Sequence, residues 1–439
     1  MLPVTNTKMS SLDPTNLNTS AQASLAKHVV PTTTPPALSI RRRMSGRDIH
    51  QEHRASSPLE ALFDLTTVVA VGAAASRLHH DIAAGHYVQA MIDLVFSFFT
   101  VWWSWMNFAW FSSAYDTDDI SYRLATVVQM VGVLVMAVSM TLDTAGQLMG
   151  TLGYTIMRVA LVGLWLRAAR EHPERRATCC RYALGLTVLQ GLWLLRALVL
   201  PTAWALPSFA VLVALELAVP AWGERAGETP WHPHHIAERY ALFTIILLGE
   251  CMVAAANAMS GVLRPQDWSA DFIVVSFSIV GLIVGLWWTY FLVPFAQVLH
   301  LRRERAFLWG YGHAPVFIAL AALNGVLELV ADVLKGGASH TVGIAHEGTS
   351  PLLAIALSAA AVMVFLAALW WLGGQTTRRA ERTPWLLLPP LLLACTAVAV
   401  VAYGLPLPWG LLLLTFAPAT LIAVVMHRRH LQPDRFAVR

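Results

Sequence analysis

The sequence is poor in charged residues and lacks the polar linkers that separate soluble domains. Only 13% of its 439 residues are Asp, Glu, Lys or Arg, and 56% are hydrophobic. A soluble chain of this length would divide into about two or three domains joined by polar segments, and none is evident between residues 58 and 426. The net charge of +4 gives no footprint for a nucleic acid partner. These features exclude an ordinary soluble protein and favour a membrane protein.

Cysteine is scarce, and the motifs of familiar enzymes are missing. Of the four Cys, two are adjacent (Cys179 and Cys180) and two lie inside apolar runs, so the sequence predicts no disulfide framework. No phosphate-binding loop, nucleophile elbow, zinc-protease helix or dinucleotide fingerprint occurs. The sequence therefore predicts no cofactor and no metal, and it leaves open whether the protein is an enzyme.

Long apolar runs dominate the rest of the chain. About twelve of them approach the ~20 residues that a helix needs to cross a bilayer, and the alternation typical of barrel strands is absent. We therefore predict an all-α, polytopic transmembrane helix bundle with about 12 spans, whose immediate partner is the lipid bilayer. The predicted spans are 58–79, 88–112, 123–141, 148–168, 180–200, 203–222, 239–261, 271–295, 307–333, 350–373, 385–403 and 407–426.

The distribution of positive charge predicts the orientation of these spans. All but five of the 30 Lys and Arg fall in segments that share one side of the membrane, and such a bias marks the cytoplasmic side. Both termini are therefore predicted to be cytoplasmic. The exceptions are Arg77, Arg196, Arg264 and Lys335 on the outer side and Arg158 within a span.

The two ends of the chain differ from the membrane domain, which we place at 56–430. Residues 1–55 are rich in Ser, Thr, Asn and Pro and end in a basic run, which predicts a disordered basic cytoplasmic tail. Residues 428–439 form a second, short basic cytoplasmic tail. The sequence does not decide whether Met1 or Met44 is the true start.

Weak internal matches suggest a parallel repeat of six plus six spans, with halves 56–222 and 231–427. Each half carries an Ala-Leu-Phe triplet early in its first span and a Trp pair in its second. The matching residues are Ala61, Leu62 and Phe63 with Ala241, Leu242 and Phe243, and Trp102 and Trp103 with Trp287 and Trp288.

Ionisable side chains at membrane depth are costly, which makes them candidates for function. Acidic residues outnumber the single Arg at that depth, which favours a cation or proton path over an anion path. We expect Glu250 to be the proton or cation site with Arg158 as its charge partner, and we expect Glu250 or Glu216 to pair with Arg158. The alternative is a purely structural polar network. The predicted path consists of Asp64, Arg158, Glu216 and Glu250.

Three groups of polar residues are predicted to converge on the cytoplasmic side. His residues there could bind a metal, relay protons or sense pH, or they could cap helices and form salt bridges between loops; HxHH with Glu three residues later is no standard zinc spacing. Asp in the second group could simply cap the third span. The predicted cluster comprises Glu60 with Asp64 nearby, Asp116, Asp118, Asp119, Arg123, His232, His234, His235, Glu238 and Arg239.

Several stretches together resemble a known family. They are Ser57–Leu65, Trp102–Trp105, Asp116–Asp119 with Arg123, Gly153–Arg158, Leu164–Arg170, Glu228–Arg239 with Leu248–Glu250, and Trp309–His313. In these motifs the chain is similar to the bacterial low temperature requirement protein A (LtrA) family over residues 55 to 430. The resemblance implies a bacterial inner-membrane protein linked to growth in the cold, and it implies no substrate or reaction.

The leading interpretation is a transporter-like inner-membrane protein, coupled to protons or cations, that moves a small ion or small molecule. One alternative is an intramembrane or lipid-modifying enzyme that uses the cytoplasmic His and Asp residues. Another is a sensor of membrane state involved in cold growth. The sequence does not specify the substrate, the direction, the coupling ion or the oligomeric state.

Overall fold

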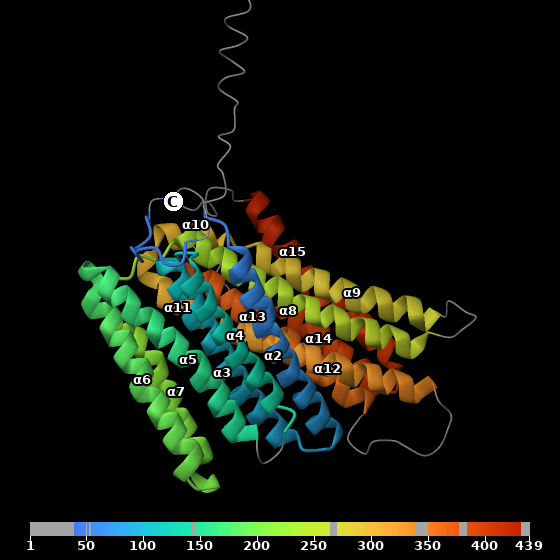
Figure 1. The fold of residues 1–439 in the computed structure, drawn as a ribbon. Helices are drawn as coiled ribbons and strands as arrows, with labels where there is room; N and C mark the ends of the chain where they lie inside the picture. Colours follow the sequence, from blue (N-terminus) through green and yellow to red (C-terminus); the bar gives the residue numbers. More distant parts are fainter. Residues whose placement is uncertain are drawn as a thin grey trace, which may run out of the picture.

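The computed structural model describes residues 39–49, 51, 54–142, 146–263, 270–338, 350–376 and 384–431. Long helices run back and forth between the two ends of one bundle (Figure 1), and the described residues contain no strand. They are α2 (Pro58–Ala83), α3 (Tyr87–Tyr115), α4 (Ile120–Ser139), α5 (Gly146–Glu171), α6 (Arg176–Val199), α7 (Ala205–Glu224), α8 (Pro233–Val262), α9 (Ala270–Phe291), α12 (Ala314–Ala338), α13 (Pro351–Thr376), α14 (Leu388–Ala402) and α15 (Leu407–Leu431), with the short α10 (Phe295–Leu301) and α11 (Ala306–Gly312) between α9 and α12.

The fold class is confirmed as a polytopic helical bundle. Among the described residues, 11 helical segments are long and apolar enough to cross a membrane. The 29-residue α3 is also long enough, and Asp93 is its one charged residue. Trp102, Trp103 and Trp105 of α3 are almost fully buried, because this helix packs against α2, α5, α8 and α12. With α3 included, each predicted run corresponds to a helix.

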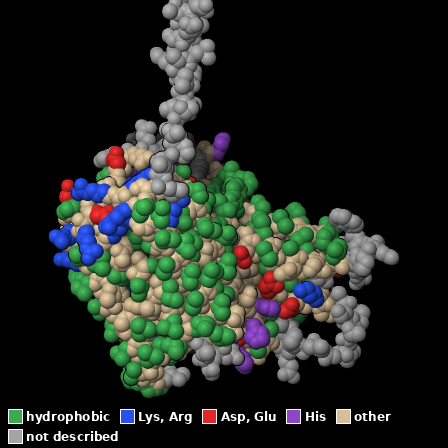
Figure 2. All heavy atoms as spheres, viewed as in Figure 1, with side chains coloured by type: hydrophobic (Ala, Val, Ile, Leu, Met, Phe, Trp, Pro, Cys, Tyr) green, Lys and Arg blue, Asp and Glu red, His purple; other side chains and the backbone are tan. Residues whose placement is uncertain are grey.

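The two ends of the bundle differ in charge. We call the end where α2, α4 and α8 begin the basic end, and the other end the opposite end. Figure 2 shows Lys and Arg side chains gathered at the basic end, above sides covered by hydrophobic residues. The end of α15 and the segment 39–49 both lie at the basic end (Figure 1), as an even number of crossings requires.

Part of the segment that the sequence assigns to a disordered tail packs against the bundle. The backbone N–H of Arg42 donates to Asp119 Oδ2 at 2.8 Å, and that of Met44 donates to Glu171 Oε2 at 2.6 Å. The Met44 side chain is fully buried. The predicted tail of 1–55 is therefore wrong for residues 39–49, because carboxylates at the ends of α4 and α5 hold their backbone. Residues 1–38 and 432–439 of the two predicted tails lie outside the described residues.

Small residues allow the closest helix contacts. A Cβ on Gly132 of α4 would lie 2.6 Å from the Gly153 carbonyl of α5, and a Cβ on Gly153 would lie 2.7 Å from the Gly132 carbonyl. A Cβ on Gly325 of α12 would lie 2.5 Å from the Ala75 carbonyl of α2. Membrane helices lack a hydrophobic driving force for association, so backbone contacts at small residues carry much of their packing. These contacts fix α4 on α5 and α12 on α2.

The two Trp pairs of the suggested repeat lie in different environments. Trp102 and Trp103 are 2% and 1% exposed, whereas Trp287 and Trp288 of α9 are 44% and 46% exposed. The two Trp pairs therefore do not share a structural role. The six-plus-six repeat stays a prediction from the sequence.

Candidate functional site

A buried ion pair lies within the part of the bundle formed by α3 to α7. Arg158 of α5 donates from Nη2 to Glu216 Oε2 of α7 at 2.7 Å, and the two side chains are 1% and 0% exposed. We call these two residues the buried pair. An unpaired Arg at this depth would cost at least about 3 kcal/mol, so the pairing of Arg158 with an acidic residue follows from its place in the chain. The structure confirms that expectation.

The partner of Arg158 is Glu216, and the predicted pairing with Glu250 is wrong. Glu250 lies on α8, and its carboxylate lies beside Gly72 of α2. No ion pair of Glu250 is found among the described residues. Glu216 is the partner because α7 packs beside α6, which in turn packs beside α5; the order of helices in space decides between two acids of similar depth.

Aromatic side chains complete the coordination of the buried pair. Trp103 Nε1 donates to Glu216 Oε2 at 3.0 Å, and Trp193 Nε1 donates to Oε1 at 2.9 Å. Tyr154 lies one turn before Arg158, hydrogen-bonds its Nη2, and places its ring 4.4 Å from the guanidinium carbon. Both carboxylate oxygens of Glu216 are thus satisfied. Arg158 Nε and Nη1 are buried without a hydrogen-bond partner among the described residues, so the guanidinium keeps donors that the buried pair does not use.

A pocket of about 680 Å³ opens from the opposite end and reaches Tyr154 and Trp193, which contact the buried pair. Its mouth lies among the first turns of α3, α5 and α7 and the last turns of α4 and α6. Its deepest residues include Thr100, Tyr154 and Trp193, and Tyr154 lies eight residues into α5, or roughly 12 Å along the helix axis. Since Tyr154 and Trp193 hydrogen-bond directly to the buried pair, the pocket floor and the pair form one unit.

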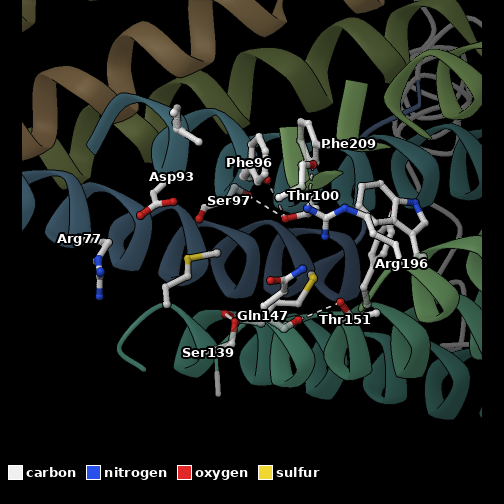
Figure 3. Close-up of a pocket in the computed structure, with 18 of the residues that line it drawn as sticks. Arg77, Asp93, Phe96, Ser97, Thr100, Ser139, Gln147, Thr151, Arg196 and Phe209 are labelled. Carbon is white, nitrogen blue, oxygen red and sulfur yellow. Dashed lines mark hydrogen bonds between the residues drawn. The ribbon is translucent and has the colours of Figure 1, made fainter. Parts of the chain in front are cut away.

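Polar and aromatic side chains line the pocket on different elements (Figure 3). Gln147 and Thr151 of α5 lie across from Phe96 and Thr100 of α3. Arg196 of α6 lies beside this group, whereas Asp93 lies near Arg77 toward the other side of the view. The volume and the mixed lining are those of a site for a small molecule.

Aromatic rings fill the space between the buried pair and the basic end. The Trp165 ring of α5 stacks on Tyr182 of α6 with centroids 4.2 Å apart, and Tyr115 of α3 packs edge-on against Trp165 at 5.9 Å. We call Tyr115, Trp165 and Tyr182 the aromatic plug. The Tyr115 hydroxyl lies 3.2 Å from His172 Nδ1, and burial lowers the pKa of His172. A neutral ring can accept this hydrogen bond, which fastens the plug to the loop after α5.

A second cluster ties α2 to α8 at the basic end. Arg239 of α8 forms an ion pair with Asp64 Oδ1 at 2.5 Å and with Glu60 Oε1 at 3.2 Å. His235 Nε2 lies 3.1 Å from Glu60 Oε1. Glu60 with Asp64 and His235 with Arg239 are each four residues apart, so each pair occupies one face of its helix, and the two faces meet.

Arg54 completes this cluster, although nothing in its local sequence pattern distinguishes it from the other Arg residues before the first span. Its guanidinium lies 3.9 Å from Glu60 and donates to the Ser112 and Ser113 carbonyls at 2.9 and 2.5 Å. It also lies 3.4 Å from Asp116, and burial raises the pKa of Asp116. We call Arg54, Glu60, Asp64, His235 and Arg239 the α2–α8 cluster; all five are at most 6% exposed.

The remaining acidic residues of the predicted cluster separate into two groups. Asp118 pairs with Arg123 at 2.8 Å on the exposed surface. Asp119 is the N-cap of α4, as the capping alternative proposed, and it pairs with Arg167 at 2.5 Å. Although burial acts to raise the pKa of Asp119, hydrogen bonds from Arg167 and the Arg42 backbone hold it well below its ordinary value.

The His residues of the same cluster also divide. His232 caps α8: its Nδ1 accepts from the His235 N–H at 3.4 Å, and its Nε2 lies 2.6 Å from the Gln51 carbonyl. His234 and Glu238 are four residues apart and share a different face of α8 from His235 and Arg239. Within the described residues, no group of three or more His, Cys, Asp or Glu is placed to hold a metal ion.

Three Trp side chains that contact the charges were missed by sequence reasoning. Trp103, Trp105 and Trp193 each donate an indole N–H to a buried carboxylate, with Trp105 reaching Asp64 Oδ1 at 2.6 Å. A buried Trp N–H needs an acceptor, so the presence of Trp and acidic residues at membrane depth could have suggested indole–carboxylate hydrogen bonds. The sequence could not show which Trp contacts which acid, because that depends on which helices are neighbours.

The comparisons place this chain among known proteins. Residues 55–426 match the family model described as the bacterial low temperature requirement A protein, LtrA. The chain belongs to the LtrA family. The matched region starts before α2 and ends within α15, so it contains the buried pair, the pocket, the aromatic plug and most of the α2–α8 cluster of this LtrA protein.

One curated relative is similar to this chain, and its printed description names no function. An uncharacterized protein of Rhizobium meliloti (strain 1021) is 27% identical over 290 residues, which cover 60% of this chain and 66% of the relative. The chain thus spans just under two thirds of the length of that curated relative. No solved structure matches.

Proposed function

We propose that this LtrA protein is a transporter of the bacterial inner membrane, with both termini in the cytoplasm, that moves a small solute between α3 and α7. One observation carries the proposal: a pocket from the opposite end stops at Tyr154 and Trp193, which are hydrogen-bonded to a fully buried ion pair. Beyond the pair, the aromatic plug closes the way to the basic end. This is the geometry of a path open on one side only, with its charged site near the middle.

Proton coupling would act at Glu216. Protonation of this carboxylate removes the charge that balances Arg158, and it leaves a buried guanidinium that needs another acceptor. A bound anion or a rearrangement of α5 against α7 would supply one. Glu216 therefore replaces Glu250 as the coupling residue, while Glu250 and Asp64 lie on α8 and α2, outside the α3–α7 path.

The α2–α8 cluster has a different role in this proposal. Its charges lie at the basic end between α2, α3 and α8, and it holds these three helices together. Asp64 and Glu60 act there as parts of the cytoplasmic closure. Glu238 and His234, which belong to the predicted cytoplasmic cluster, lie one helix position before Arg239 and His235 and so on another face of α8.

The enzyme alternative receives less support from the same residues. A catalytic His or Asp needs a free face toward a substrate. His232 is occupied by a helix cap, His235 by Glu60, and Asp119 by Arg167.

The native Cys179 provides a test of the proposed path. It is fully buried beside Tyr115, with Sγ 3.5 Å from the hydroxyl, so it reports on the aromatic plug. We would change Cys180, Cys251 and Cys395 to Ala and treat vesicles of both orientations with a membrane-impermeant maleimide. We expect slow labelling of Cys179 in inside-out vesicles only, and faster labelling in Glu216→Gln. Labelling of Thr151→Cys, in the pocket, is expected in right-side-out vesicles only.

A matched control makes the same Glu→Gln change at a residue outside the proposed transport path. Glu250→Gln replaces a carboxylate that has no ion pair among the described residues, and it should leave Cys179 labelling unchanged. If Cys179 stays protected from both sides in every variant while Thr151→Cys is labelled, the pocket is a dead end and the transporter proposal is wrong.

A further inference from the structure

Arg196 carries a buried positive charge that no carboxylate of the described residues neutralises. It lies in the last turn of α6 and is only 6% exposed. Its Nε donates to the Ser208 hydroxyl at 3.1 Å and its Nη2 to the Ala205 carbonyl at 3.1 Å, and both acceptors are neutral. No ion pair of Arg196 occurs in the part of the chain that the structure describes, in contrast to Arg158 and Arg239. Buried charges are normally paired, so this one lacks a counterion.

The unsatisfied part of Arg196 faces the pocket. Its Nη1 makes no hydrogen bond to any described residue, yet it is not among the buried atoms without a partner, so it remains accessible. Arg196 lines the pocket, and Figure 3 shows its guanidinium among the lining side chains, beside Phe209 and Thr100. The donor is therefore aimed at the place where a ligand would sit.

Aromatic rings surround this donor. Phe96 and Phe209 stack with centroids 3.7 Å apart. The Arg196 guanidinium carbon lies 5.9 Å from the Phe96 ring and 5.7 Å from the Trp193 ring. A charge in such an apolar wall interacts strongly with an opposite charge, because little water screens the contact.

The other charges of the pocket already have partners. Arg77 pairs with Asp81 at 2.8 Å, and Asp93 accepts from the Gln89 amide at 2.7 Å. In Figure 3 Asp93 lies away from Arg196 and closer to Arg77. Among the residues that the structure describes, the site thus offers the Arg196 donor, an aromatic wall, and hydroxyl and amide groups from Ser97, Thr151 and Gln147.

We propose that the pocket binds an organic anion, with its negatively charged group on Arg196 and its apolar body against Phe96, Phe209 and Trp193. This inference rests on the proposed function, because it names the class of solute that the transporter would take. Trp193 links the two sites, since it lines the pocket and donates to Glu216. The anionic group can belong to a water-soluble carboxylate or to an anionic lipid whose head group enters the pocket.

The test measures protection of a pocket thiol by a defined probe. The full chain with Thr151→Cys as its only thiol is reconstituted in phosphatidylcholine nanodiscs and labelled with a maleimide. 3-Phenylpropionate is the anionic probe, and 3-phenylpropanamide is its neutral match. We expect the carboxylate to slow labelling in a saturable way, and the amide to be at least about 10-fold weaker, as a lost charge-assisted hydrogen bond implies.

Variants assign this protection to Arg196. Arg196→Gln should weaken the carboxylate by roughly 10-fold or more and leave the amide unchanged, and Arg196→Lys should restore part of the difference. Glu250→Gln removes a charge outside the pocket lining and should bind the carboxylate as the parent does. Melting temperatures in the same nanodiscs check that Arg196→Gln is folded.

Each outcome decides the inference. Equal protection by the two probes, no protection by either, or unchanged carboxylate protection in a folded Arg196→Gln would overturn it. If labelling is already slow in phosphatidylglycerol nanodiscs, and Arg196→Gln restores it, the anion is a lipid head group. If the carboxylate protects through Arg196 while Cys179 never becomes accessible, the anion site stands and the transporter proposal fails.

Discussion

Breaking the buried pair should destabilise the protein in a strongly non-additive way. Arg158→Met leaves Glu216 charged in a dry site, although the Trp103 and Trp193 indoles still donate to it. Glu216→Gln leaves Arg158 charged with only Tyr154 beside it. Removing one member of a buried ion pair typically costs about 3–5 kcal/mol, because the other charge stays buried. The double variant has no unpaired charge, so it should cost less than the sum by about 2–4 kcal/mol.

The free energy of unfolding would be measured by SDS titration in mixed micelles for the parent, both single variants and the double variant. Glu250→Gln, alone and with Arg158→Met, provides the control: it should cost little and should add to Arg158→Met without coupling. Strict additivity of Arg158→Met and Glu216→Gln would refute the pairing, and with it the role of Glu216. Coupling of Arg158 to Glu250 instead would show that the wrong acid was chosen.

Three further predictions test the fold and the basic end. Burial lowers the pKa of His232 below its ordinary value of 6.5, and a proton on its Nδ1 would oppose the His235 N–H that this nitrogen caps. The melting temperature should therefore fall as the pH drops below about 6.5. The fall should be smaller in His232→Asn, because Asn provides a cap that does not titrate. A fall of equal size in both proteins would exclude His232 as the cause. Gly325→Ala should cost about 1–3 kcal/mol in the same SDS titration, because its Cβ meets the Ala75 carbonyl at 2.5 Å. Gly163→Ala meets nothing within 4 Å and should be neutral or stabilising by up to about 1 kcal/mol; equal costs would contradict the packing of α12 on α2. Reporter fusions after residues 176, 303 and 435 should be cytoplasmic and those after 145 and 266 periplasmic, and a single reversal would break the assigned orientation.

The bundle was predictable from the sequence because the length of each apolar run shows where a membrane-spanning helix lies. The distribution of Lys and Arg predicts on which side of the membrane each connecting segment lies. Each predicted run became a helix, and the i, i+4 pair Glu60 and Asp64 did share a face. The capping box formed by Ser57 and Glu60 at the start of α2 follows from the local spacing as well.

The site was only partly predictable, since neighbours across helices depend on the order of packing. Depth alone left Glu216 and Glu250 equal as partners of Arg158, and the sequence chose Glu250 wrongly. Arg196 looked like one of a few cations on the outer side, because nothing in the chain says that it turns into a pocket. The segment 39–49 looked like part of a tail, since its partners Asp119 and Glu171 come much later in the chain.

In the proposed transport path, the aromatic plug opens when the charge of Glu216 is lost. Asp118 and Glu174 lie on exposed loops beside the plug, after α3 and after α5, so spin labels at these two sites report its width. Pulsed electron–electron double resonance in nanodiscs should give one short distance in the parent and a second, longer one in Glu216→Gln, with Glu250→Gln behaving as the parent. A single, unchanged distance in a folded Glu216→Gln would contradict the account.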